Sequence, residues 1–220
     1  MSHNTLAHRA LRPAVRALAA TPVTPDVLTA LRLATGLGAA WCFASHHGLM
    51  SAGAGLFLLS MLLDRADGEL ARQTRRFSRI GGNFDLTADC ISTMAIFIGL
   101  GIGAGAAPSF AAYLRWDPSL LAWTGPILGL AGAIGVAVIF ALLNVSLSAS
   151  HGLQSVEPIR RLFDPDDVML LLPVVIWCGG TNGLVLAMGL ITPVAAIGLI
   201  VVRLLHQRHA GDALSVGRPI

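Results

Sequence analysis

Six apolar runs separated by short polar stretches constrain the fold of this chain more than any other feature. They cover about residues 27–46, 49–70, 84–106, 119–147, 166–180 and 183–205. A helix that crosses a bilayer needs about 20 apolar residues, and only the fifth run is clearly shorter. Charged residues make up 12% of the chain, about half the share of a typical soluble domain. The sequence therefore predicts an all-α integral membrane protein with six transmembrane helices.

The arginines predict the orientation of the chain, because cytoplasmic segments of membrane proteins carry an excess of positive charge. With a cytoplasmic N-terminus, the outer loops hold only Arg115. The inner segments then hold Arg9, Arg12, Arg16, Arg75, Arg76, Arg79, Arg160, Arg161, Arg208 and Arg218. We therefore expect both termini on the cytoplasmic side of the inner membrane, together with residues 72–80.

The segment before the first run has two distinct helical faces, one basic and one apolar. Arg9, Arg12 and Arg16 share the basic face, which indicates an amphipathic helix lying on the inner leaflet. The alternative is a disordered arm. The predicted organisation is a juxtamembrane helix, a six-span domain and a disordered cytoplasmic tail, over residues 1–24, 25–206 and 207–220.

Residues 63–89 hold nearly half of the 12 acidic residues, namely Asp64, Asp67, Glu69, Asp85 and Asp89. On a helix, Asp64 and Asp67 lie about 60° apart, and Glu69 points about 140° away from Asp64. Asp85 and Asp89 are spaced by four, so they share one stripe of the next helix. The short loop between these helices predicts antiparallel neighbours with facing aspartate stripes. We expect Glu69 to lie outside the site that the four aspartates form.

Four carboxylates in a low-dielectric environment repel one another and need neutralisation. Hard oxygen ligands suit Mg²⁺ or Mn²⁺, and two such ions would form a clamp for phosphoryl transfer. Gly68, Ala71 and Gly81 leave space for a bulky phosphorylated ligand, and Arg72 suits a phosphate.

Two other interpretations of the acids are a structural salt-bridge network with nearby arginines and an ion pathway in a transporter. Carboxylates inside a membrane cost free energy, and four on facing stripes exceed what a structural network requires. One polar cluster at the inner boundary does not form a route across the membrane. A metal-dependent enzyme that acts on a membrane-embedded substrate is the interpretation we favour.

The same residues follow a fixed spacing from Asp64 to Asp89. The segment resembles the CDP-alcohol phosphotransferase motif DxxDGxxARx8GxxxDxxxD, and all eight fixed positions match. A second likeness lies at TPDVLTALR, residues 24–32, which resembles the Pro-Asn-x-Leu-Thr-x-x-Arg opening of the first span in many members. Asp26 replaces the asparagine here.

The resemblance implies transfer of a substituted phosphoryl group from a CDP-linked alcohol, commonly CDP-diacylglycerol, to a hydroxyl acceptor, with release of CMP. It implies that Asp64, Asp67, Asp85 and Asp89 hold two divalent cations, Mg²⁺ or Mn²⁺. Asp89 would also be the catalytic general base. The site for the CDP-alcohol would comprise Asp67, Gly68, Ala71, Arg72 and Gly81, with Thr29 and Arg32 approaching the nucleotide.

Alternatives remain for the upstream residues: Thr24 or Asp26 caps the first span, and Arg32 snorkels to the interface. The resemblance also implies a homodimer in contact with membrane lipid. We expect no nucleic acid among the partners.

Basic residues near the inner boundary indicate a pocket for a phosphorylated acceptor, such as glycerol 3-phosphate or an inositol phosphate. They are Arg75, Arg76, Arg79, Arg160, Arg161 and Arg203. The alternative is that they only reflect the positive-inside bias. The segment DGELAR with SRIGG also resembles members that join two inositol phosphates. The competing functions are transfer from a soluble CDP-alcohol to a lipid acceptor and cation transport without catalysis.

Overall fold

The computed structural model describes residues 15, 17, 19, 21–45, 48–74, 81–105, 118–149 and 170–216, and these form helices without strands. The side chains of residues 81–83, 118–122, 143–149 and 206–216 are not described. The helices are α2 (Pro25–Ala44), α3 (Met50–Thr74), α4 (Gly81–Gly105), α6 (Pro118–Ala149), α9 (Leu171–Trp177) and α10 (Thr181–Val216). The all-α prediction is confirmed for this part of the chain.

Four of these helices contain segments long and apolar enough to cross a membrane. They are Pro25–Ala44, Phe84–Gly105, Trp123–Leu142 and Thr181–Leu205, in α2, α4, α6 and α10. The 25 residues of α3 extend over about 37 Å, but its C-terminal half carries charged side chains. The helix α9 has only seven residues, and most of the chain before it lies outside the described part. Six spans therefore remain a prediction, with four supported by length and composition.

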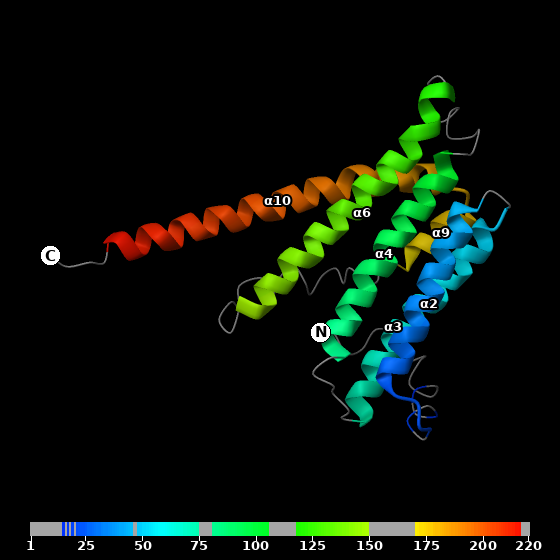
Figure 1. The fold of residues 1–220 in the computed structure, drawn as a ribbon, viewed down its shortest axis with the longest axis horizontal. Helices are drawn as coiled ribbons and strands as arrows, with labels where there is room; N and C mark the ends of the chain where they lie inside the picture. The colour runs from blue at the N-terminus through cyan, green and yellow to red at the C-terminus, as the bar shows by residue number, and fades with distance from the viewer. Residues whose placement is uncertain are drawn as a thin grey trace.

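The helices form a bundle in which α2, α3 and α4 lie together and α6 follows on the other side of α4 (Figure 1). Buried side chains of α2, α3, α4 and α6 form the main core, with Phe43, Phe57, Phe97 and Leu100 among them. The helices α4 and α6 approach closely at glycines. A Cβ atom on Gly101 would lie 2.5 Å from the carbonyl oxygen of Gly125, which is too close for any side chain.

The predicted direct packing of α3 against α4 is wrong for the described residues. The helix α2 packs against both of them, whereas α3 and α4 make no helix–helix contact with each other. Polar residues of α2 explain this arrangement, because Thr29 and Arg32 supply donors to carboxylates from both neighbours. The backbones of α3 and α4 are therefore bridged by α2, while the aspartate side chains of the two stripes meet one another directly.

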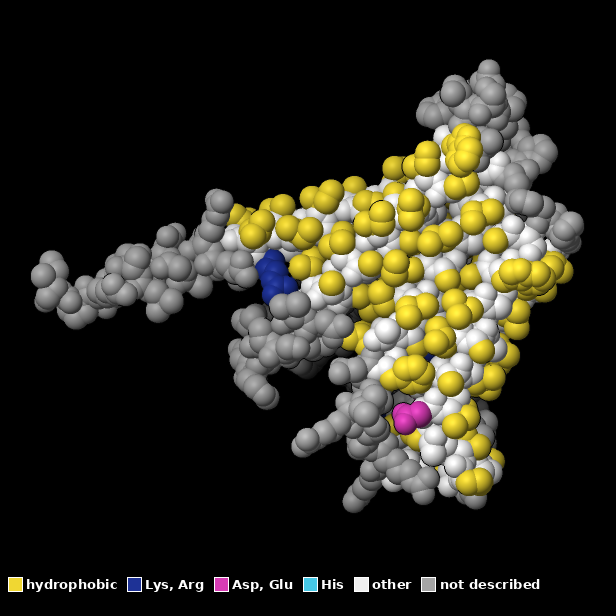
Figure 2. Space-filling view, in the orientation of Figure 1, with side chains coloured by type: hydrophobic (Ala, Val, Ile, Leu, Met, Phe, Trp, Pro, Cys, Tyr) yellow, Lys and Arg dark blue, Asp and Glu magenta, His cyan; other side chains and the backbone are white. Residues whose placement is uncertain are grey.

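The helix α10 leans away from the bundle and presents apolar side chains to the surroundings (Figure 1). Leu190, Ile191, Val194 and Ile197 are all more than half exposed, as expected for a helix that faces lipid. Hydrophobic side chains cover the viewed face across α4, α6 and α10, and acidic side chains lie at its lower end (Figure 2). Because α10 continues to Val216, the expected disordered tail is wrong for residues 207–216.

Most of the predicted N-terminal amphipathic helix lies outside the described residues. Val15 is described and fully buried in a small cluster with Leu28, Ala66 and Leu70. This cluster joins α2 and α3 beside the acidic part of α3. The segment before α2 therefore contacts the same end of the bundle as the aspartates.

Candidate active site

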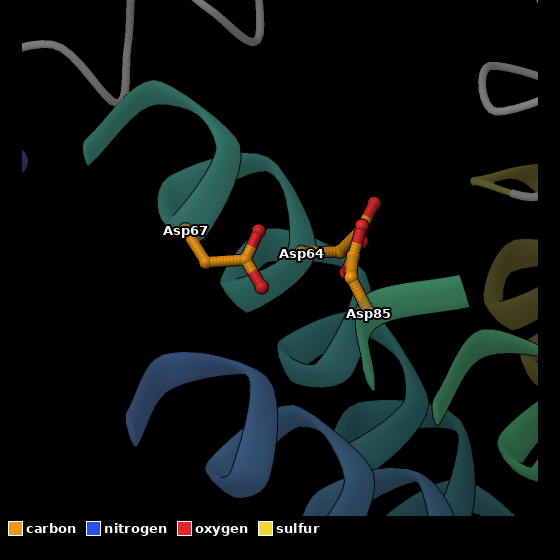
Figure 3. A group of neighbouring side chains, drawn as sticks. All are labelled: Asp64, Asp67 and Asp85. Carbon is orange, nitrogen blue, oxygen red and sulfur yellow. The ribbon is translucent and has the colours of Figure 1, made fainter. Parts of the chain in front are cut away.

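Three of the predicted aspartates converge at one end of the bundle. Asp64 and Asp67 come from α3, and Asp85 comes from the first turns of α4 (Figure 3). One carboxylate oxygen of each lies within 4.8 Å of the corresponding oxygens of the other two. The three-residue spacing of Asp64 and Asp67 places both on one side of α3, and Asp85 reaches them from α4 although the two helices do not pack directly.

Arg32 of α2 lies among the carboxylates. Its guanidinium forms ion pairs with Asp64, with Asp85 at 3.1 Å and with Asp89 at 3.0 Å. Its Nη2 atom also donates a 2.8 Å hydrogen bond to the backbone carbonyl of Asp85. The Arg32 side chain is only 2% exposed, so the interpretation that it snorkels to the interface is wrong. Arg32 instead links the fourth aspartate, Asp89, to the other three.

Hydroxyl groups support this arrangement from within the bundle. Thr29, one turn before Arg32, donates a 2.9 Å hydrogen bond to Asp67 Oδ2. Ser60 of α3 donates a 3.0 Å hydrogen bond to the backbone carbonyl of Arg32. Thr24 stands at the N-cap of α2, but its side chain makes no capping hydrogen bond. The threonine and arginine of the upstream segment therefore act on the aspartates themselves.

Glu69 lies outside the carboxylate cluster, as predicted from its helical angle. Its carboxylate pairs with Arg72 Nη2 at 3.0 Å and accepts a 3.0 Å hydrogen bond from Gln73. Among the described residues, a Cβ atom added to Gly68 would come within 4 Å only of the Arg72 guanidinium. This side of α3 therefore has open space next to an arginine that is 39% exposed.

The aspartates of this cluster fit a divalent cation, both by the chemistry of their oxygens and because some of these oxygens can accept further contacts. Carboxylate oxygens are ligands that Mg²⁺ and Mn²⁺ prefer. The Oδ1 atom of Asp85 is buried and accepts no hydrogen bond from the described residues, although Arg32 lies nearby. Arg32 offsets only one of four negative charges. The carboxylates of Asp64, Asp85 and Asp89 also remain 34%, 46% and 41% exposed, so a ligand has access to them.

A cavity of about 120 Å³ adjoins the cluster on the side of the apolar core. Arg32, Asp64, Arg65 and Asp89 line its polar part, and Phe57, Met61, Ile96 and Phe140 line its apolar part, with Ser60, Ser92 and Thr93 beside them. The Ser92 hydroxyl is buried and has no hydrogen-bond partner among the described residues. The cavity therefore contains an unused hydrogen-bonding group beside the carboxylates.

The serines were not predicted as site residues. Ser60 precedes Asp64 by four residues and Ser92 follows Asp89 by three, so each shares a helix face with an aspartate. That periodicity was the signal available in the sequence. It does not reveal that both serines meet Gly36 of α2, where a Cβ atom would lie 2.8 Å from Ser92 Oγ and 3.3 Å from Ser60 Oγ.

The predicted acceptor arginines are only partly covered by the structure. Arg203 of α10 donates a 3.4 Å hydrogen bond to the carbonyl of Leu142, which connects α10 to α6. The other five lie outside the described residues: Arg75, Arg76, Arg79, Arg160 and Arg161. Gly81 is the first residue of α4, and Ala71 lies in the last two turns of α3. The predicted acceptor pocket stays a prediction.

Known proteins share this sequence pattern. The archaetidylinositol phosphate synthase of Pyrococcus horikoshii is 32% identical over 111 residues, which are 50% of this chain and 53% of that protein. The bifunctional IPC transferase and DIPP synthase of Rubrobacter xylanophilus is 30% identical over 163 residues, 64% of this chain and 37% of that protein. The phosphatidylinositol phosphate synthase of Mycobacterium tuberculosis is 38% identical over 93 residues, 42% of each chain. The matched parts therefore span about half or less of these relatives.

A profile of one protein family matches most of the described helices that carry the site. Its description is CDP-alcohol phosphatidyltransferase, and the match covers residues 22–163. These residues include both motif segments and all four aspartates. The resemblance found in the motif is confirmed over more than half of the sequence. The chain belongs to the CDP-alcohol phosphatidyltransferase family.

Proposed function

We propose that this protein transfers the phosphatidyl group of CDP-diacylglycerol to a hydroxyl of an inositol phosphate and releases CMP. The observation that carries the proposal is the convergence of Asp64, Asp67 and Asp85 within 4.8 Å, with Asp89 joined to them through Arg32. The family match supports the reaction class. The names of the archaetidylinositol phosphate and phosphatidylinositol phosphate synthases favour an inositol phosphate over other acceptors.

The four aspartates would hold two divalent cations, Mg²⁺ or Mn²⁺. Such ions, when bound, supply positive charge that offsets the pyrophosphate of the donor and the leaving CMP. The open space beside Gly68 leaves room for the nucleotide on α3. Arg72 at the end of the same helix is exposed enough to contact a phosphate, and its fork of donors matches phosphate oxygens.

Asp89 is the proposed general base. Its carboxylate is 41% exposed, so an acceptor hydroxyl can approach it. Asp89 takes the hydroxyl proton while the hydroxyl oxygen forms a bond to the phosphorus that carries the diacylglycerol. The bond between that phosphorus and the CMP oxygen breaks, and CMP leaves with the electron pair. The products are a phosphatidylinositol phosphate and CMP.

The proposed location of this site is the cytoplasmic side of the inner membrane, with both termini cytoplasmic. The support is the distribution of arginines, which favours a cytoplasmic location for the aspartate end of α3. CDP-alcohols and phosphorylated acceptors are charged, so a site at an aqueous boundary suits them better than one at the bilayer centre. The homodimer implied by the family remains a prediction.

A CMP-release assay tests the proposal. The purified protein is incubated with CDP-diacylglycerol and Mg²⁺ or Mn²⁺, in parallel with an inositol phosphate, inositol, glycerol 3-phosphate or no acceptor. We expect metal-dependent CMP and a new phosphorylated lipid only with the inositol phosphate. CMP release with glycerol 3-phosphate instead would reassign the acceptor. No metal-dependent CMP with any acceptor would refute the enzymatic proposal.

A further inference from the structure

Arg32 occupies the position in the site that cations would need. Its Nη1 atom contacts carboxylate oxygens of both Asp64 and Asp89, and Nη2 contacts Asp85. We infer that Arg32 is an internal counter-ion that competes with divalent cations for these oxygens. It thereby holds the carboxylates together in the ion-free protein and weakens their affinity for ions. The inference rests on the proposed metal-dependent function.

The competition follows from the limited number of oxygens. Asp64 belongs to the group of three carboxylates suited to an ion and also pairs with Arg32 Nη1. Mg²⁺ binds oxygens at about 2.1 Å, and a guanidinium on the same carboxylates competes with it for lone pairs. Like charges also repel at this separation. Loading the site therefore requires Arg32 to give up its contacts with Asp64 and Asp89.

The contacts of Arg32 also favour its release. Its Nε atom is buried and has no hydrogen-bond partner among the described residues. An unsatisfied buried donor costs free energy, so the ion-free arrangement does not satisfy the whole side chain. The hydrogen bond from Ser60 to the Arg32 backbone carbonyl holds the main chain of α2 and does not involve the guanidinium.

The cavity beside the carboxylates provides space for the displaced guanidinium. Arg32 already lines this cavity, and Ser92 lies on its wall. The buried Ser92 hydroxyl has no partner, so it is available to accept a hydrogen bond from the arginine. We assign the Ser92 oxygen as the acceptor for Arg32 in the ion-loaded protein.

Binding of Mn²⁺ alone tests this inference without reference to catalysis. The full chain in detergent is titrated with Mn²⁺ and free ion is measured by electron paramagnetic resonance. Arg32→Met removes the charge and keeps a similar length, and we expect it to bind Mn²⁺ at least tenfold more tightly than the parent chain. Arg32→Lys keeps the charge but cannot reach three carboxylates at once, so its affinity rises less. Arg115→Met is the matched control, since the arginine distribution predicts Arg115 in an outer loop, away from the aspartates.

Thermal unfolding gives a second readout on the same samples. In the presence of EDTA, Arg32→Met should unfold at a lower temperature than the parent chain, because the carboxylates lose their counter-ion. Saturating Mn²⁺ should raise its unfolding temperature by more than it raises that of the parent. Ser92→Ala should bind Mn²⁺ about two- to tenfold more weakly, which corresponds to one lost hydrogen bond.

Several outcomes would overturn the inference. If Arg32→Met binds Mn²⁺ no more tightly than the parent chain, Arg32 does not compete with the ion. If Arg32→Met does not fold, the same criterion applies to Arg32→Lys. Unchanged affinity in Ser92→Ala would refute the role of the cavity. Absence of Mn²⁺ binding in every chain would also refute competition. Failure of the proposed function looks different, because Mn²⁺ would then bind without metal-dependent CMP release.

Discussion

The hydroxyl of Thr29 on α2 donates a 2.9 Å hydrogen bond to Asp67 Oδ2 on α3, and this bond is buried. It orients a carboxylate that lies only 5% exposed, from a helix that also carries Arg32. Bonds of this kind fix the direction of a ligand oxygen before an ion arrives. The upstream segment at residues 24–32 thus supports the aspartates of the motif at residues 64–89.

Replacing Thr29 tests this orientation. Thr29→Val keeps the shape and removes the donor, and we expect Mn²⁺ affinity and CMP release to fall by about tenfold or more, as for other groups that orient metal ligands. Thr35→Val is the matched control, because the Thr35 hydroxyl bonds only to carbonyls of its own helix among the described residues. Equal behaviour of the two variants would remove Thr29 from the site.

The three converging carboxylates predict loss of ion binding when one is neutralised. Asp67→Asn should weaken Mn²⁺ binding by at least about tenfold, because a charged ligand oxygen is lost. Glu69 lies two residues from Asp67 and pairs with Arg72 and Gln73, so Glu69→Gln should keep the Mn²⁺ affinity of the parent chain. Mn²⁺ titrations of both variants measure the difference, and a similar loss in both would indicate general electrostatics and not ligation.

Asp89→Asn separates proton transfer from binding. A general base contributes about 10²–10⁴-fold to a rate, so turnover should fall by that factor. Binding of CDP-diacylglycerol in the presence of metal should survive, since Asp64, Asp67 and Asp85 remain to hold an ion. Single-turnover CMP release and equilibrium binding of the donor check the two parts. A parallel loss of binding and turnover would contradict the assignment of Asp89 as the base.

Gly36 predicts a stability effect at the meeting point of three helices. A Cβ atom there would lie 2.8 Å from Ser92 Oγ and 3.0 Å from Ser92 Cβ, so Gly36→Ala should destabilise the protein by about 1–3 kcal/mol. A Cβ atom on Gly55 of α3 would meet none of the described residues within 4 Å, so Gly55→Ala should be neutral or stabilising. The unfolding temperatures of the two variants measure the difference. An unchanged unfolding temperature for Gly36→Ala would show that the helices can move apart with little loss of free energy.

Cysteine labelling tests the proposed orientation in the membrane. Cys178 is exposed between α9 and α10, at the end predicted to lie outside, while Cys42 is buried. A membrane-impermeant maleimide should label Cys178 in intact cells. Gln73→Cys combined with Cys178→Ser should react only after permeabilisation, because α3 is predicted to end on the cytoplasmic side. Labelling of Gln73→Cys in intact cells would reverse the topology.

The sequence by itself determined the class of protein and the chemistry of its site. Apolar length predicted helices that the structure places close to the expected ranges, because the bilayer requires long runs of apolar residues. The spacing from Asp64 to Asp89 predicted which carboxylates belong together and left out Glu69, because the 3.6-residue helical repeat decides which side chains share a face.

Only the tertiary structure decided how the two halves of the motif meet. Periodicity locates side chains on one helix but does not say which helix packs against it. The structure packs α2 against both α3 and α4, and Thr29 and Arg32 satisfy carboxylates from these two helices. The buried position of Arg32 and the unused hydroxyl of Ser92 follow from that packing, since each depends on atoms from helices far apart in the sequence.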